Sequence, residues 1–180
     1  METVHRLLAE GVFNELTMEQ IADRAGVSRA TLYQHFDSRL ALVDMICDRF
    51  AVNPSLLAVR RAVRLDDYRA AVELVIENAL GFWSSEEGVL SQLYGVVAID
   101  PSARALVERQ REDRRQEMET FARRLRRAGT LRDGVSERQA VARLMVLTSF
   151  ETYRELGEAG LPVRERVKLL TSMAETALLA

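Results

Sequence analysis

Polar side chains crowd one short stretch of this chain, and their types and spacing suit contact with a nucleic acid. Five of the seven positions from 29 to 35 carry hydrogen-bonding side chains: Arg29, Thr31, Tyr33, Gln34 and His35. The forked guanidinium of an arginine matches the edge of a guanine, and hydroxyl, amide and imidazole groups bond readily to phosphate oxygens. Ala30 is small enough to let the backbone approach a thymine methyl group. This surface fits DNA recognition better than it fits catalysis.

Each of these side chains has a second interpretation that the sequence leaves open. Arg29 could contact a phosphate, or remain in solvent, instead of reading a base. Tyr33 could pack against the preceding helix, and His35 could have a structural role. The difference matters because phosphate contacts set affinity and register, whereas base contacts supply sequence specificity.

Two short helices joined by a tight turn are predicted to position these groups. Thr17, with Gln20 three residues later, forms a capping box typical of a helix start. Gly26 is the residue type that most easily adopts the left-handed backbone which ends a helix. Ser28 can cap the second helix, in which Leu32 is one of the few apolar residues. Helix, short glycine-containing turn and helix together indicate a helix-turn-helix.

These residues also carry a resemblance to a known family. The 22-residue stretch IADRAGVSRATLYQHFDSRLAL, which begins at Ile21, is similar to the DNA-binding region of the tetracycline-repressor (TetR) family of bacterial transcription regulators. The resemblance covers roughly the first quarter of the chain, and it implies phosphate contacts from Thr31, Tyr33, His35 and Arg39. The predicted DNA-binding residues are Thr17, Ser28, Arg29, Ala30, Thr31, Tyr33, Gln34, His35 and Arg39.

Composition narrows the class of protein. The 180-residue chain is 48% hydrophobic and 29% charged, as is usual for a soluble globular protein. No leader and no membrane-length apolar run is evident, so we expect a cytoplasmic protein without a membrane partner. The single cysteine, Cys47, excludes an internal disulfide and is expected to be buried. The two histidines are far apart and no catalytic or nucleotide-binding motif is present, so no metal site, cofactor or enzymatic activity is predicted.

The charge balance of the N-terminal part is unusual for a DNA-binding region. Residues 1–50 contain five arginines and eight acidic residues, which gives a net charge of −3, although the whole chain has a net charge of only −2. DNA binding requires a local basic surface rather than a basic chain, so we expect modest affinity with the acids facing away from the duplex. A helical protein-interaction module with a degenerate helix-turn-helix therefore remains an alternative.

The remainder of the chain is predicted to be helical, which makes the fold all-α. We expect about nine helices in two domains, a three-helix DNA-binding domain over residues 1–50 and a helical effector-binding and dimerisation domain over residues 51–180. Capping boxes predict helix starts at Ser84 and Ser136, and Asp100 before a proline predicts another. The helix from Ser136 is expected to continue to about residue 158.

Aromatic and soft side chains gather in the C-terminal part, where core packing is their default role. The family resemblance implies that this region encloses a small-molecule cavity whose occupancy changes the spacing of two DNA-binding domains. The scarcity of lysine and histidine there favours an apolar or amphipathic effector. The candidate pocket residues are Phe82, Trp83, Tyr94, Met118, Phe121, Phe150 and Tyr153.

A homodimer is expected because one short helix reads too few base pairs to select a site in a genome. Two copies related by two-fold symmetry would present two such helices to half-sites of a palindromic operator, about 34–36 Å apart. The resemblance places the interface on the last two predicted helices, although the same stripes could instead fill the core of one protomer. The candidate interface residues are Ala140, Leu144, Leu147, Val167, Leu170 and Ala174.

Together these features predict a ligand-responsive transcription regulator that binds double-stranded DNA, most simply a repressor. An activator without a small-molecule pocket is the nearest alternative. The interaction module is the alternative from a different class, and a steep fall of affinity with salt would distinguish DNA binding from it.

Overall fold

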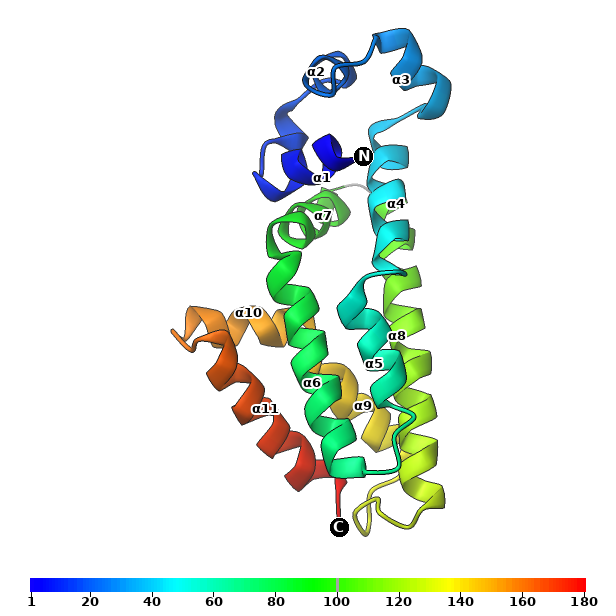
Figure 1. Cartoon of the computed structure of the whole chain (residues 1–180), viewed down its shortest axis with the longest axis vertical. Coiled ribbons are helices and arrows are strands. Elements are labelled where there is room, and N and C mark those ends of the chain that lie inside the picture. Colours follow the sequence, from blue (N-terminus) through cyan, green and yellow to red (C-terminus); the bar gives the residue numbers. More distant parts are fainter. Residues whose placement is uncertain (100) are drawn as a thin grey trace. The chain divides into compact units, whose positions relative to one another are not determined.

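The computed structural model describes residues 1–99 and 101–180, and these residues form helices joined by short turns (Figure 1). The predicted all-α class is confirmed, with eleven α-helices and one 3-10 helix in the described ranges instead of about nine. The elements are α1 Glu2–Ala9, η1 Phe13–Glu15, α2 Met18–Arg24, α3 Arg29–His35, α4 Arg39–Phe50, α5 Pro54–Ala62, α6 Tyr68–Ser85, α7 Glu87–Ile99, α8 Pro101–Arg127, α9 Glu137–Leu147, α10 Phe150–Glu158 and α11 Val163–Leu178. None of the helices in these ranges is long and apolar enough to cross a bilayer.

The chain forms two compact units. The first contains residues 1–52 and 86–110, and the second contains residues 53–85 and 111–180. The first unit therefore includes α7 and the beginning of α8 in addition to the predicted helix-turn-helix. The predicted division of functions between residues 1–50 and residues 51–180 stays a prediction.

In the first unit, α7 packs closely against α1. A Cβ added at Gly88 would lie 2.5 Å from the carbonyl oxygen of Ala9, so the two backbones approach each other where a side chain would not fit. Polar contacts flank this approach: the His5 Nε2 and Glu86 Oε2 atoms are 2.7 Å apart, and Asn14 Nδ2 donates to Gln92 Oε1 at 2.9 Å. The absence of a side chain at position 88 thus allows α7 to support the N-terminal helices.

Two of the three predicted capping boxes are present. The hydroxyls of Thr17 and Ser136 each accept the backbone N–H of the third helical residue, which is a glutamine. In return, the backbone N–H of each capping residue donates to the Oε1 atom of that glutamine. The prediction at Ser84 was wrong, because α6 continues through Ser85 and α7 begins only at Glu87. The predicted cap Asp100 lies outside the described residues.

The helix predicted from Ser136 to residue 158 is broken, so this prediction was also wrong. The Thr148 hydroxyl donates to the carbonyl of Leu144 at 2.7 Å, and Ser149 caps α10. The freed carbonyl of Thr148 accepts hydrogen bonds from Trp83 Nε1 at 3.0 Å and Arg114 Nη1 at 2.7 Å. Side chains from α6 and α8 therefore satisfy the backbone at the break.

Cys47 is buried in α4, as expected, and it gives a testable prediction. Burial, with the nearby Asp44 carboxylate adding to it, raises the pKa of the Cys47 thiol from 9.0 to about 12, and the side chain is only 1% exposed. The thiol therefore stays protonated near neutral pH, and the thiolate is the reactive form. A disulfide reagent such as DTNB at pH 8 is expected to leave the folded protein unmodified and to titrate one thiol after unfolding. Rapid reaction of the folded protein would contradict this placement.

Candidate nucleic-acid interface

A tight turn joins α2 and α3 as the sequence predicts. Gly26 has a φ of 67°, in the left-handed region that favours glycine. The N–H of Val27 closes the turn by donating to the carbonyl of Ala22 at 3.1 Å. Ile21 on α2 is fully buried and Leu32 on α3 is 6% exposed, so these apolar side chains hold the two helices against the first unit.

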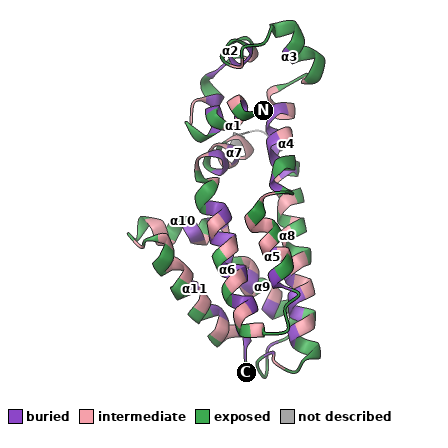
Figure 2. Cartoon of the chain, viewed as in Figure 1, coloured by how far each residue is buried: buried purple, intermediate pink, exposed green. Residues whose placement is uncertain are grey.

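The polar side of α3 lies on the surface. In Figure 2 most of α3 is coloured as exposed, and Leu32 is its only buried residue in the described part of the helix. Tyr33 retains 44% of its surface, so its ring does not pack into the core of the unit. The predicted residues that the structure brings together on this exposed surface are Ser28, Arg29, Ala30, Thr31, Tyr33, Gln34 and His35.

Hydroxyl groups on this surface are tied to the backbone. The Ser28 hydroxyl accepts the N–H of Thr31 at 3.0 Å, and the two hydroxyl oxygens are 2.8 Å apart. The Thr17 hydroxyl accepts the N–H of Gln20 at 3.2 Å at the start of α2. Each hydroxyl is exposed and helps to fix the first turn of its helix, so the backbone from which the neighbouring side chains project is also fixed.

Arg29 lies between an acid and an aromatic ring. Its Nη1 atom is 3.8 Å from Glu19 Oε2, and its guanidinium carbon is 5.5 Å from the centroid of the Tyr33 ring. The side chains of Arg29 and Glu19 are 64% and 65% exposed. Glu19 was absent from the predicted site, because its proximity to Arg29 depends on the angle between the two helices and has no local sequence signal.

Arg39 has a different environment from the other predicted DNA-binding residues. Its Nη2 atom donates to the carbonyl of Phe13 at 2.7 Å, and its guanidinium carbon is 5.1 Å from the centroid of the Phe13 ring. The same nitrogen is 3.4 Å from Asn14 Oδ1. Arg39 thus ties η1 to the start of α4, and a phosphate contact from this residue stays a prediction.

Replacing Arg39 by alanine is therefore expected to destabilise the free protein. Loss of the charged hydrogen bond and the ring contact should lower the free energy of unfolding by about 1–2 kcal/mol. Urea unfolding without DNA measures this effect. The contrary result would be an unchanged unfolding midpoint and a salt slope for DNA binding that is smaller by about one phosphate contact. Arg39 would then contact phosphate and contribute nothing to the stability of the free protein.

Six of the seven candidate pocket residues are buried in the second unit, and several of their rings pack together. The Trp83 and Phe150 ring centroids are 5.6 Å apart, and the Phe150 and Tyr153 rings stack at 6.1 Å. Phe82 lies against Trp83 with a centroid distance of 4.8 Å. Met118 and Phe121 on α8 are 1% and 0% exposed, whereas Tyr94 lies on α7 in the first unit.

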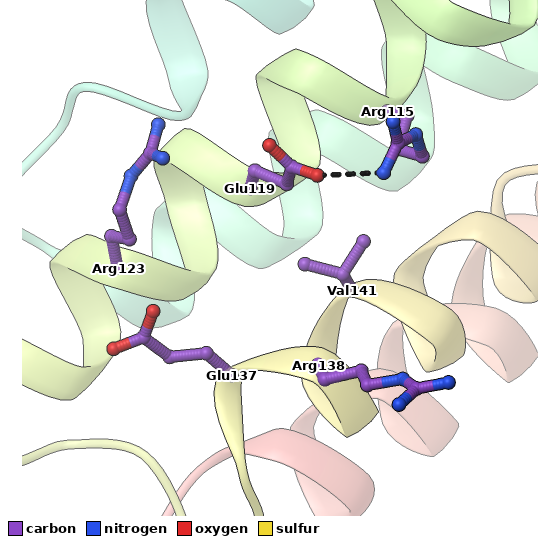
Figure 3. A pocket seen from close by; sticks show the side chains of 6 residues that line it. All are labelled: Arg115, Glu119, Arg123, Glu137, Arg138 and Val141. Carbon is purple, nitrogen blue, oxygen red and sulfur yellow. Dashed lines mark hydrogen bonds and ion pairs between the residues drawn. The ribbon is translucent and has the colours of Figure 1, made fainter.

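A groove of about 260 Å³ lies between α8 and α9 in the second unit (Figure 3). It is lined by Arg115, Glu119, Arg123, Glu137, Arg138 and Val141. All but one of these side chains are charged, and Arg115 is paired with Glu119 at 2.9 Å. The groove shares no lining residue with the predicted apolar effector site.

The candidate interface residues do not form an exposed surface. Ala140, Leu144 and Ala174 are 0% exposed and Leu170 is 1% exposed, because α6 and α9 pack against α11 within the protomer. Leu147 is 7% exposed, and Val167 is half-buried. The large apolar side chains that these helices do expose are Val146 at 62%, Leu169 at 40% and Met173 at 48%. Surface positions of α9 and α11 are thus the ones available to another molecule.

Helix-turn-helix motifs are a class of DNA-binding motif. Comparison with known proteins matches the part of the chain that contains this motif to a family. Residues 1–46 match the family described as bacterial regulatory proteins, tetR family. This match confirms the resemblance found in the sequence and assigns it to the N-terminal quarter of the chain. Among the described residues no cluster of three or more His, Cys, Asp or Glu side chains could hold a metal ion.

Individual proteins resemble this chain either in the sequence of one part or in the fold. The helix-turn-helix transcriptional activator FasR of Mycolicibacterium smegmatis is 46% identical over 66 residues, which is 36% of this chain and only 30% of FasR. A candidate regulator from Saccharomonospora viridis, solved with choline, has a TM-score of 0.79 at 23% identity and covers 99% of this chain and 95% of its own. SmeT, the repressor of a Stenotrophomonas maltophilia multidrug efflux pump, has a TM-score of 0.73 at 19% identity over 99% of this chain and 88% of its own. At such identities the structural neighbours show the fold alone.

Proposed function

We propose that this chain is a transcription regulator that inserts α3 into the major groove of double-stranded DNA. The observation that carries the proposal is the exposed polar surface of α3, which a single buried residue, Leu32, attaches to the unit. Arg29 and Tyr33 are its largest exposed side chains that can both donate hydrogen bonds and meet base edges. The function of FasR and SmeT as transcription regulators supports the same proposal. No enzymatic activity is proposed, and such a protein would act in the cytoplasm, where the chromosome lies.

The active form is proposed to be a homodimer. Two copies of α3 would contact half-sites one helical turn apart, and this spacing gives the selectivity that one helix lacks. The exposed residues Val146, Leu169 and Met173 supply apolar surface on α9 and α11 for this contact. The predicted residues Ala140, Leu144, Leu170 and Ala174 would then support the interface from within the protomer.

A small-molecule effector, apolar or amphipathic, is proposed to bind the second unit. The aromatic cluster around Trp83 and Phe150 supplies the apolar surface that such a ligand needs. SmeT was solved with triclosan and the S. viridis protein with choline, which supports a ligand for this fold. The effector would release DNA if it bound more tightly to a conformer of the dimer in which the two α3 helices are not spaced to reach both half-sites. Repression is the simplest outcome of blocking a promoter, and activation, as in FasR, is the alternative.

Selection from a random double-stranded DNA library tests the proposed function. We expect the protein to enrich a palindrome whose half-site centres are about 10 base pairs apart. Affinity for the enriched duplex should fall linearly on a plot of log K against log salt, by about 0.9 for each phosphate contacted. A folded protein that enriches no sequence at low salt would contradict DNA recognition and favour the protein-interaction module.

A further inference from the structure

Most arginines of the N-terminal region are already engaged with groups of their own chain. Arg6 pairs with Glu10 at 3.4 Å, Arg39 donates to the carbonyl of Phe13, and Arg29 pairs with Glu19 at 3.8 Å. Residues 1–50 also have a net charge of −3. Sequence-independent attraction to phosphates, which depends on accessible positive charge, is therefore weak in this region.

Local structure fixes the backbone positions from which Glu19 and Arg29 project, although both side chains are exposed. The capping box of Thr17 fixes the first turn of α2, and Ser28 fixes the first turn of α3. Glu19 and Arg29 project from these two turns, and the Gly26 turn sets the angle between them. The Tyr33 ring on the next turn of α3 gives the guanidinium a second favourable neighbour.

The carboxylate of Glu19 changes which acceptors can use Arg29. A phosphate that approaches Arg29 must approach a like charge on Glu19, and it competes with that charge for the same guanidinium. The edge of a guanine is neutral and offers two acceptors, N7 and O6. Because a guanidinium has five N–H donors, Arg29 can keep its contact with Glu19 through Nη1 and present its other donors to a base.

We propose that Glu19 is a specificity-determining residue that disfavours phosphate at Arg29 and reserves this arginine for a base edge. The inference rests on the proposed function. It assigns to Glu19 the role of directing Arg29 to a base, while Glu19 itself contacts no base. Glu19 is a positioning residue in this account. Its effect appears in the ratio of affinities for specific and unrelated DNA.

The test compares Glu19→Gln with Glu10→Gln. Both variants remove one carboxylate from an exposed arginine–glutamate pair of the same unit, and neither is expected to unfold the protein because such pairs contribute little stability. The probes are the duplex enriched from the random library and a scrambled duplex of the same length. Affinities for both are measured between low and physiological salt.

Glu19→Gln is expected to raise affinity for the scrambled duplex on the order of fivefold more than affinity for the enriched duplex, and to steepen the salt slope for scrambled DNA by about 0.9. Glu10→Gln should change both affinities equally and leave the ratio unchanged. Equal ratios in the wild type, Glu19→Gln and Glu10→Gln would overturn the inference while the proposed function stands. A wild type that enriches no sequence would instead overturn the proposed function, and the inference with it.

Discussion

Replacing Arg29 by alanine is expected to weaken binding to the enriched duplex about tenfold to a hundredfold. A bidentate contact from arginine to guanine contributes about 1–3 kcal/mol of discrimination, and each 1.4 kcal/mol corresponds to a factor of ten. The loss should concentrate at one base pair of each half-site, so that the variant accepts any base there. Repeating the library selection with the variant measures this change directly.

Arg49→Ala is the matched control for this prediction. Arg49 is an exposed arginine of the same unit, in the last turn of α4, and its removal changes the net charge equally. We expect Arg49→Ala to weaken binding slightly and uniformly across sequences. If both variants weaken all duplexes to the same extent, Arg29 contributes only charge and the base-reading role is wrong.

Replacing Gly88 by alanine is expected to lower the free energy of unfolding by about 1–3 kcal/mol, the usual cost of overpacking. The new Cβ would lie 2.5 Å from the Ala9 carbonyl oxygen and 3.0 Å from the Ala9 Cα, so the backbone of α1 or of α7 must move. Alanine normally stabilises a helix relative to glycine, which makes a destabilised variant diagnostic. Urea unfolding of the free protein measures the effect.

Gly95 on the same helix provides the control. A Cβ there meets no atom within 4 Å, so Gly95→Ala should raise the free energy of unfolding by about 0.5–1 kcal/mol. The opposite signs of the two substitutions are the expected result. Stabilisation by Gly88→Ala would mean that α1 and α7 do not pack as closely as the structure places them.

Local sequence signals predicted the parts of the site that depend on neighbouring residues. The capping box at Thr17, the turn at Gly26 and the cap at Ser28 are set within a few residues of the chain, and the structure has all three. The exposed face of α3 follows from the same local pattern, because apolar residues there are too few to bury more than one side of the helix.

Contacts between distant segments could not be predicted in the same way. Arg39 and Phe13 are 26 residues apart, and their hydrogen bond requires η1 to lie beside the start of α4. The break at Thr148 is satisfied by Trp83, 65 residues earlier in the chain. A local signal for the break did exist, since Ser149 is a good helix cap, but it competes with a continuous apolar pattern.

The stripe of residues predicted for the dimer interface, on α9 and α11, shows a different limit of sequence reasoning. Small and branched residues at helical spacing mark a face that packs against something, but the spacing does not say whether the partner is the same chain. In α9 and α11 this face packs within the protomer, as the burial of Leu144 and Leu170 shows. The exposed neighbours Val146, Leu169 and Met173 lie on helical positions that the stripe did not include.

The most direct test of the central claim, that α3 reads bases in the major groove, pairs Arg29 with the atom it is proposed to contact. In the enriched duplex, each guanine is replaced in turn by 7-deazaguanine, which lacks only the N7 acceptor in the major groove. At one position per half-site we expect the wild type to lose about tenfold in affinity or more, and Arg29→Ala to lose nothing further, because the partner side chain is already absent. Equal losses in the two proteins, or no loss at any guanine, would contradict major-groove reading by Arg29.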